Sequence, residues 1–245
     1  MKRMHAVVTG GGSGIGAAVA KRLLADGARV TLMGRSLERL QAQQAVLGDV
    51  VIQACDVADE DSVTDAFAAV GDVDVLVNNA GQVETAPLAR TSLELWQRLL
   101  NVNLTGTFLC SRAVLPGMVA RGQGRIVNVA STAALKGYAY VAAYCAAKHG
   151  VLGLTRALAV EVAARGVTVN AVCPGYTETD IVAAAVENIV AKTGRTPEQA
   201  RAELAKANPQ GRLIQPEEVA AAVAWIVASS AINGQAIAVC GGETM

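Results

Sequence analysis

The sequence predicts an α/β protein of the Rossmann type, built on one doubly wound parallel sheet of about seven strands. Short β-branched runs alternate with longer amphipathic runs, in the order HAVVTG, GAAVAKRLLADG, RVTLMG, SLERLQAQQAVLG and VVIQACDV. This alternation is typical of β-α-β units, in which helices cover both faces of a parallel sheet. Hydrophobic residues make up 52% of the chain and aromatic residues only 3%, so the core must consist of small and branched aliphatic side chains.

Further strands are expected along the rest of the chain, within VDVLVNNAG, GRIVNVAS, GVTVNAVCPG and GQAIAVCGG, with helical stretches between them. The chain of 245 residues suits one domain, which we expect to span residues 1–245. Residues 176–215 interrupt the alternation, because they are more polar, contain Pro197 and Pro209 and offer two short helical pieces without a strand. We interpret them as an insertion over the end of the sheet, and favour a substrate lid over a surface excursion.

Charge and cysteine content exclude several classes of partner. Lysine plus arginine number 21 and aspartate plus glutamate 21, so no basic field attracts nucleic acid or anionic lipid. We therefore expect a small-molecule partner, no nucleic acid and no membrane. The start of the chain lacks the pattern of a signal peptide and the longest apolar run covers about half a membrane span, which predicts a cytoplasmic protein. The five cysteines show no paired spacing, so neither disulfides nor a metal site is expected.

A glycine-rich turn follows the first predicted strand. In VVTGGGSGIGAAVAKRL, Gly10, Gly12 and Gly16 lie between strand and helix, with Ser13 and Ile15 in the same turn. Missing side chains let the backbone approach a pyrophosphate, and the N-terminus of the helix donates to it. Because strand, glycines and helix come in the order that a dinucleotide site requires, the turn predicts such a site.

The end of the second predicted strand bears on the choice of cofactor. An acidic residue at this place holds the ribose of NAD, but here Gly34 takes that position and Arg35 follows. A guanidinium binds a 2′-phosphate, so NADP(H) is favoured, with NAD(H) as the alternative if Arg35 is only a solvated residue at a helix start. Asp56 and Val57 follow the third strand, where Asp56 is placed to meet the adenine ring and could equally cap the next helix, two roles that are compatible.

Several motifs together resemble the short-chain dehydrogenase/reductase family over essentially the whole chain. They are TGGGSGIG, NNAG, NVNLTG, IVNVAS, YCAAK and NAVCPGYTETD, in this order and at spacings familiar from that family. The resemblance implies a catalytic tetrad of Asn103, Ser131, Tyr144 and Lys148. It implies further cofactor contacts from Asn79, Ala80, Gly81, Pro174, Gly175, Thr177 and Thr179, besides Tyr144 and Lys148.

The physical chemistry of these side chains agrees with the implied roles. A tyrosine with a pKa of about 10 exchanges protons poorly at neutral pH, and an ammonium four residues on along a helix should lower that pKa. Ser131 ends a strand, where its hydroxyl can donate to a substrate carbonyl and the developing alkoxide. The resemblance implies that Asn103 binds a water molecule, which links Lys148 to solvent. From the sequence alone, Asn103 could equally kink or cap a helix.

Within the family, the chain looks most similar to polyketide ketoreductases and 3-oxoacyl-thioester reductases. This implies a carbonyl or secondary-alcohol substrate, in particular a 3-oxoacyl or 3-hydroxyacyl thioester of coenzyme A or a carrier protein. A simple ketone or cyclic alcohol is the alternative, which the apolar residues Ile181, Val182 and Val186 would suit. A non-catalytic NADP(H) sensor is disfavoured, because Tyr144 and Lys148 are both present.

Three further expectations concern charge and assembly. The bases of the insertion could meet a coenzyme A phosphate or form a solvated face; they are Lys192, Arg195, Arg201, Lys206 and Arg212. The glycine turn holds no basic residue to assist Arg35, which departs from the family pattern, as does Cys240 where an aspartate is frequent. Family members are commonly tetramers, so the resemblance implies a homotetramer.

Overall fold

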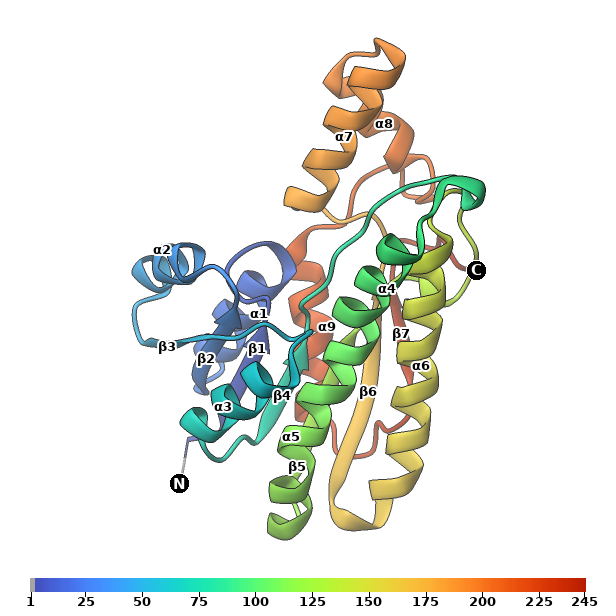
Figure 1. Cartoon of the computed structure of the whole chain (residues 1–245). Coiled ribbons are helices and arrows are strands. Elements are labelled where there is room, and N and C mark those ends of the chain that lie inside the picture. The colour runs from blue at the N-terminus through green and yellow to red at the C-terminus, as the bar shows by residue number, and fades with distance from the viewer. Residues whose placement is uncertain (1–2) are drawn as a thin grey trace.

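A computed structural model describes residues 3–245 and contains a parallel sheet of seven strands in the order β3-β2-β1-β4-β5-β6-β7 (Figure 1). The strands are β1 (His5–Thr9), β2 (Arg29–Gly34), β3 (Val50–Ala54), β4 (Val75–Asn78), β5 (Gly124–Val129), β6 (Val167–Pro174) and β7 (Ala236–Val239). The order runs outward from β1 in both directions, which defines a doubly wound sheet. The predicted fold class and strand number are confirmed.

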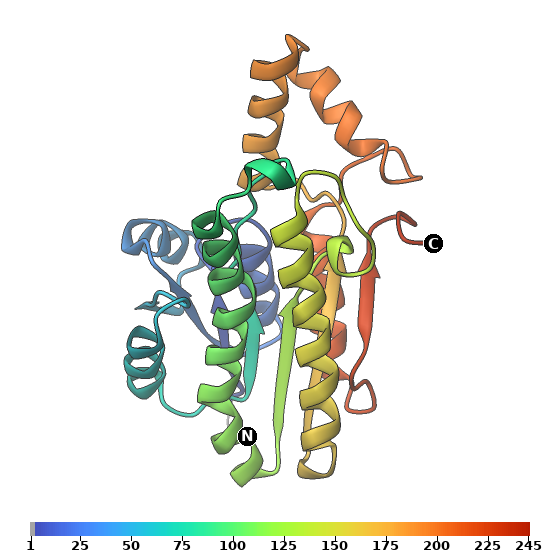
Figure 2. The same ribbon diagram turned by 45° about the vertical axis from the view of Figure 1, so that its right-hand side comes forward.

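Helices cover both faces of the sheet (Figures 1 and 2). One face carries α1 (Gly14–Ala25), α2 (Leu37–Leu47) and α9 (Pro216–Ala228), and the other carries α3 (Glu60–Val70), α5 (Gly106–Arg121) and α6 (Ala142–Val162), with α4 (Leu93–Leu100) packed against α6. Successive strand residues face opposite layers: Val8 belongs to the core beneath α1 and α9, and Val7 to the core beneath α3 and α5. Both residues are fully buried, so each strand contributes to two hydrophobic cores.

Residues 176–215 form a helical insertion that projects from the carboxyl end of the sheet (Figure 2). It contains α7 (Asp180–Thr193) and α8 (Pro197–Ala205), which matches the two helical pieces expected there. Its two ends meet in a parallel bridge between Thr177 and Ile214, so the insertion leaves and rejoins the body at one place. Its helices share a small core of their own, which includes Val182 and Val186.

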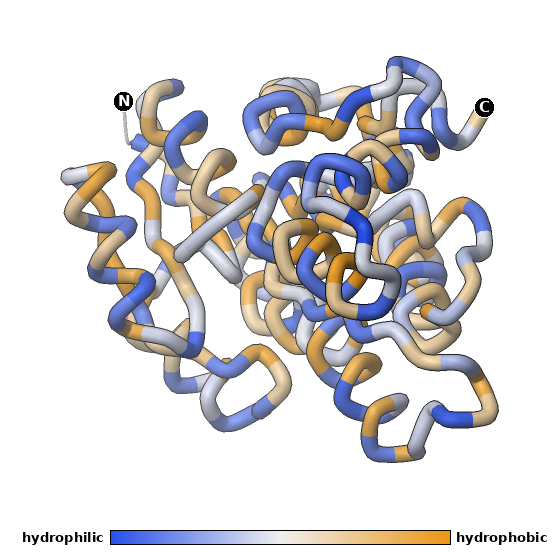
Figure 3. Tube along the Cα trace, turned by 90° about the horizontal axis from the view of Figure 1, so that it is seen from above, coloured by the Kyte–Doolittle hydropathy of each residue, from blue (hydrophilic) through white to orange (hydrophobic). Residues whose placement is uncertain are grey.

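Hydrophilic residues interrupt the hydrophobic stretches throughout the trace (Figure 3). Within residues 3–245, no helix combines the length and the apolar character needed to cross a bilayer.

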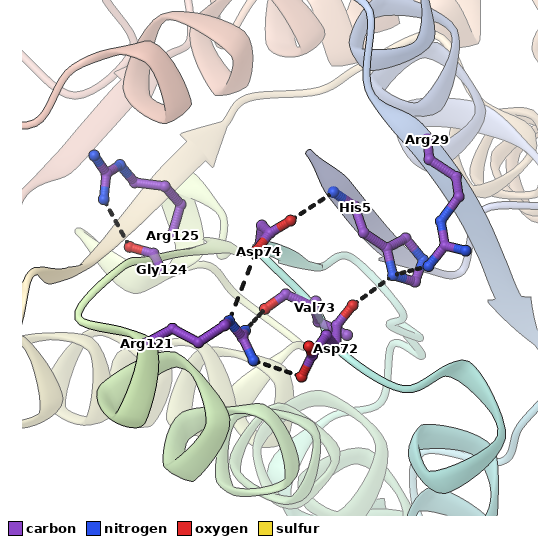
Figure 4. Close-up of polar contacts among 8 residues, drawn as sticks. All are labelled: His5, Arg29, Asp72, Val73, Asp74, Arg121, Gly124 and Arg125. Atoms are coloured by element: carbon purple, nitrogen blue, oxygen red, sulfur yellow. Dashed lines mark hydrogen bonds and ion pairs between the residues drawn. The ribbon is translucent and has the colours of Figure 1, made fainter. Parts of the chain in front are cut away.

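A network of charged and polar groups holds the amino-terminal edge of the sheet (Figure 4). Arg121, the last residue of α5, pairs with Asp72 at 2.7 Å and donates to the carbonyl of Val73 at 2.6 Å. The backbone amide of the buried His5 donates to Asp74 at 2.9 Å. These bonds fix the segment that leads into β4. The functional site lies at the opposite side of the sheet, at the carboxyl ends of the strands.

Candidate active site

A cavity of about 840 Å³ opens at the carboxyl ends of the strands, where ligands bind in doubly wound folds. Of the site residues predicted from the sequence, only Gly16 does not line it. The cavity thereby brings together Gly10, Gly12, Ser13, Ile15, Arg35, Asp56, Val57, Asn79, Ala80, Gly81, Asn103, Ser131, Tyr144, Lys148, Pro174, Gly175, Thr177 and Thr179.

The glycine turn leaves no room for side chains. Gly10 has a φ of +64°, and a Cβ atom there would lie 2.9 Å from Nδ2 of Asn79. A Cβ atom at Gly16 would lie 2.3 Å from the carbonyl oxygen of Gly10, so Gly16 allows α1 to pack against the turn rather than facing the cavity. No acidic residue occupies the first turn of α1. The backbone of this turn and the N-terminus of α1 therefore fit an anionic pyrophosphate.

The NNAG motif ties the glycine turn to the centre of the sheet. Nδ2 of Asn79 donates to the carbonyls of Thr9 and Gly10 at 3.0 and 3.1 Å. Nδ2 of the buried Asn78 donates to Oδ1 of Asn128 at 2.9 Å, which links β4 to β5. The motif therefore has a structural part in holding the floor of the cavity, besides exposing backbone to a ligand.

Two arginines, not one, line the end of the cavity near β2. Arg35 lies 4.0 Å from a carboxylate oxygen of Asp56, and both side chains are well exposed. Arg39, in the first turn of α2, also lines the cavity. Its Cβ atom would lie 3.2 Å from a Cβ atom added at Gly12, so Arg39 packs beside the glycine turn. Arg39 was not among the predicted residues, although it lies four positions after Arg35, in the first turn of the helix that was expected there.

Asp56 makes a local turn as well as facing the cavity. Its Oδ1 atom accepts from the amide of Ala58 at 3.0 Å, two residues on. The cap of α3 is Asp59, whose side chain accepts from Asp61. The suggestion that Asp56 caps α3 is therefore wrong, because Asp56 lies three positions before the N-cap residue, whose side chain meets the free amides.

Helix α6 presents Tyr144 and Lys148 to the cavity, one turn apart. Lys148 is only 4% exposed, and its Nζ atom donates to the carbonyl of Val129 at the end of β5, at 2.9 Å. The same atom lies 5.6 Å from the centre of the Tyr144 ring. Burial lowers the pKa of Lys148 to about 8, which brings its charge close to loss at physiological pH.

The pKa of Tyr144 departs from the expected direction. Burial raises it to about 12, and a hydrogen bond with Ser131 offsets only part of that rise. A lower pKa was expected for Tyr144 because of Lys148, and this expected net direction is wrong. The main cause is the loss of water around the phenolate, which disfavours the charged form. Tyr144 therefore keeps its proton at neutral pH.

Ser131 and Asn103 hold the surrounding backbone. Oγ of Ser131 accepts from the amide of Ala133 at 3.1 Å, two residues further along the chain after β5. Asn103 lies in a π-helical turn, Asn101–Thr105, and is fully buried. Its amide donates to the carbonyls of Leu99 and Gln82, both at 2.9 Å, and accepts from the amide of Gln82 at 3.2 Å. The helix-distorting role considered for Asn103 is thus present in the structure, and its side chain also anchors the loop after β4.

The loop after β6 joins the cavity to the helical insertion. Oγ1 of Thr177 donates to the carbonyl of Gly175 at 2.9 Å, and Oγ1 of Thr179 donates to that of Thr177 at 3.2 Å. The Cγ2 atom of Thr179 lies 3.1 Å from where a side chain at Gly14 would begin. The start of α7 is thus packed against the phosphate-binding turn.

The insertion contributes apolar side chains but not its bases to the cavity. Ile181 and Val182 line the cavity, whereas Val186 belongs to the core shared by α7 and α8. Four of the five bases pair with carboxylates: Arg195 and Lys206 with Glu203, Arg201 with Glu178, and Arg212 with Glu218. This pairing favours the solvated face over a phosphate site.

Two aromatic residues missing from the sequence-based set line the cavity as well. The rings of Tyr138 and Tyr176 meet edge to face, with centres 6.4 Å apart. Tyr138 belongs to no motif, and Tyr176 stands within NAVCPGYTETD but was given no role there. The two residues lie on separate loops after β5 and β6. Their proximity depends on the neighbouring positions of those two strands in the sheet.

The fold and cavity define an oxidoreductase with a nicotinamide cofactor, and the chain belongs to the short-chain dehydrogenase family, whose model matches residues 4–190. It is 42% identical over 247 residues to the 3-oxoacyl-[acyl-carrier-protein] reductase of Vibrio cholerae, covering 98% of this chain and 97% of that protein. It is 43% identical over 250 residues to the cis-4-hydroxycyclohexanecarboxylate dehydrogenase of Sinomonas cyclohexanicum, covering 98% and 96%. The crystal structure of a single-site variant of actinorhodin polyketide ketoreductase with NADPH matches with a TM-score of 0.95 at 40% identity, covering 99% of this chain and 97% of that one.

Proposed function

We propose that the protein is an NADPH-dependent ketoreductase in which Tyr144 is the general acid. The observation that carries this proposal is the convergence of Tyr144, Ser131 and Lys148 with the glycine turn and two arginines in one cavity. The phenol of Tyr144 is protonated at neutral pH, as a proton donor to an alkoxide must be.

In the proposed reaction, a bound NADPH supplies the hydride that adds to the carbonyl carbon. Ser131 donates a hydrogen bond to the carbonyl oxygen and stabilises the negative charge that grows on it. Tyr144 transfers its hydroxyl proton to that oxygen, which yields the secondary alcohol. Lys148, held by Val129, provides positive charge beside the phenol and a donor for the nicotinamide ribose. Oxidation of an alcohol is the reverse of these steps.

Arg35 and Arg39 support NADPH over NADH. Both side chains line the cavity beyond β2, where a carboxylate would otherwise select the ribose hydroxyls of NADH. A guanidinium just before α2 and another in its first turn can hold a 2′-phosphate from two sides. Arg39 thus supplies the second base that the glycine turn itself lacks.

For the substrate, we propose a 3-oxoacyl thioester carried by coenzyme A or a carrier protein. The similarity to a 3-oxoacyl-[acyl-carrier-protein] reductase and to a polyketide ketoreductase supports this class. A cyclic ketone is the second candidate, supported by the similarity to a cyclohexane-alcohol dehydrogenase and by the apolar Ile181 and Val182 on the cavity wall. We further propose, from the family alone, that the protein is a homotetramer, which sedimentation velocity would test.

The experiment that tests the function is a matched assay of reduction. Acetoacetyl-CoA and 4-oxocyclohexanecarboxylate are each offered with NADPH and with NADH, and kcat/KM is measured for the four pairs. The proposal expects the highest value for acetoacetyl-CoA with NADPH. A higher value for the cyclic ketone supports the second candidate, and binding of NADPH without turnover of any carbonyl would establish a non-catalytic sensor instead.

A further inference from the structure

A buried carboxylate near the end of the chain contacts the wall of the cavity. Glu243 lies four residues beyond the last residue of β7, and its side chain is only 1% exposed. Its Oε1 atom accepts a short hydrogen bond from the hydroxyl of Tyr138 and lies 3.2 Å from Nζ of Lys136. The same Nζ atom donates to the backbone carbonyl of Glu243 at 3.1 Å. One residue of the chain end is thus bound through both its side chain and its backbone.

The hydrogen bonds fix which way the proton of Tyr138 points. The Tyr138 hydroxyl also lies 2.6 Å from Oγ1 of Thr132. A phenol carries a single proton, and a carboxylate accepts it better than a neutral hydroxyl, so Tyr138 donates to Glu243 and accepts from Thr132. Burial, together with this bond to Glu243, raises the pKa of Tyr138 well above its usual range. Tyr138 therefore stays neutral, with its proton directed away from the cavity.

Glu243 also lies against the loop that carries the second aromatic ring. Its Oε2 atom would be 2.8 Å from a Cβ atom at Gly175, so the carboxylate lies close against the backbone of that glycine. Tyr176 follows directly, and its ring packs edge to face on that of Tyr138. The amide of Gly175 donates to the carbonyl of Val239 at 3.0 Å, which holds the loop and the end of β7 together. Glu243 thus lies behind both aromatic residues of the wall.

We propose that Glu243 is a positioning residue for the part of the cavity lined by Tyr138 and Tyr176, where the carbonyl substrate would bind. Glu243 fixes the ring of Tyr138, and Tyr138 in turn holds Tyr176 in the edge-to-face pair, so that the two rings form a rigid wall. This inference rests on the proposed function, and it assigns the chain end a part in substrate recognition. Glu243 does not line the cavity among the described residues, so it acts through Tyr138 and not by touching the substrate. Because the proton of Tyr138 is held by Glu243, this wall offers the substrate an aromatic surface instead of a second phenolic donor.

The test is the substitution Glu243→Met, which keeps the length of the side chain but accepts no proton. The variant should fold, because each group that loses Glu243 has another partner. The side chain of Lys136 is 38% exposed and can be solvated, and the hydroxyl of Tyr138 keeps its hydrogen bond with Thr132. The substitution also removes Oε2, a buried atom without a hydrogen-bond partner. We expect KM for acetoacetyl-CoA to rise about tenfold, the equivalent of one charge-assisted hydrogen bond, with kcat and the Kd for NADPH within twofold of the wild type. Glu243→Asp should recover part of the loss, and Glu217→Gln, on the exposed side of α9, is the matched control.

A double-mutant cycle separates positioning from general stabilisation. Tyr138→Phe keeps the ring but removes the hydroxyl, and should raise KM by a similar factor. If Glu243 acts through Tyr138, adding Glu243→Met to Tyr138→Phe changes KM by less than twofold. Additive effects, a fall in kcat equal to the rise in KM, or a wild-type KM in Glu243→Met would each overturn the inference. Failure of the proposed function is distinct, since the wild type itself would then turn over no carbonyl.

Discussion

Nζ of Lys148 lies 5.6 Å from the centre of the Tyr144 ring, close enough for its charge to act on the phenol. The position of Nζ is not set by α6 alone, because it donates to the carbonyl of Val129 at the end of β5. The amine is thereby held between helix and sheet and is almost fully buried. Burial lowers the pKa of Lys148 to about 8 and raises that of Tyr144 to about 12, so at neutral pH a mostly charged ammonium lies beside a protonated phenol.

Replacing Tyr144 with phenylalanine should abolish reduction with little effect on cofactor binding. Removing a general acid typically costs on the order of 10²–10⁴-fold in rate, and we expect kcat to fall by that amount. NADPH binding, followed by fluorescence, should change by less than threefold because the ring is retained. Tyr140→Phe, at a tyrosine that is 64% exposed, is the control and should behave as the wild type. A Tyr144→Phe enzyme with more than a tenth of the wild-type kcat would contradict the assignment.

Lys148 should titrate near pH 8 in the protein without ligand. The cause is desolvation, which disfavours the ammonium, so its charge is full below that pH and is lost above it. The measurement is NMR of protein labelled with ¹³C at the lysine ε-carbons, in which one resonance should move with a midpoint near 8. Lys148→Met assigns that resonance by its loss. A midpoint above 10 for Lys148 would refute the prediction.

Arg39→Ala and Arg35→Ala should each weaken NADPH selectively. A charge-assisted bond to a phosphate contributes roughly 1.5–3 kcal/mol, so KM for NADPH should rise about tenfold or more, whereas KM for NADH should change little. Arg22→Ala, which removes an exposed arginine paired with Asp26 at the end of α1, serves as the control. If Arg39→Ala leaves the ratio of the two KM values unchanged, Arg39 does not bind the 2′-phosphate.

Asn103→Ala should destabilise the fold and loosen the loop after β4. The buried side chain makes three hydrogen bonds to the backbone of Gln82 and Leu99, and each is worth roughly 0.5–1.5 kcal/mol. We expect a loss of about 2–4 kcal/mol in the free energy of unfolding, measured in urea. Asn101→Ala, at the exposed first residue of the same π-helical turn, should cost far less. Equal losses in the two variants would show that the turn, not the side chain of Asn103, is what matters.

Much of the sheet and of the site followed from local patterns. The β-α-β alternation predicted the seven strands because each buried strand is a short β-branched run, and the glycine turn was recognisable because strand, glycines and helix are contiguous. Tyr144 and Lys148 lie on one helix at a spacing of four, so their proximity is a local property too. Arg39 lies only four positions after Arg35, so its place near the cavity was also predictable from the sequence, but it was not predicted.

The sequence by itself determined the order of the elements, the phosphate-binding turn and the helical pair Tyr144 and Lys148. The tertiary structure decided the sign of the Tyr144 pKa shift, because desolvation depends on what the neighbouring segments exclude. It also joined Glu243 to Tyr138, whose separation of 105 residues hides their contact from any local pattern. In this fold such contacts form because the parallel strands bring their carboxyl ends to one edge of the sheet, and that edge is where the cavity lies.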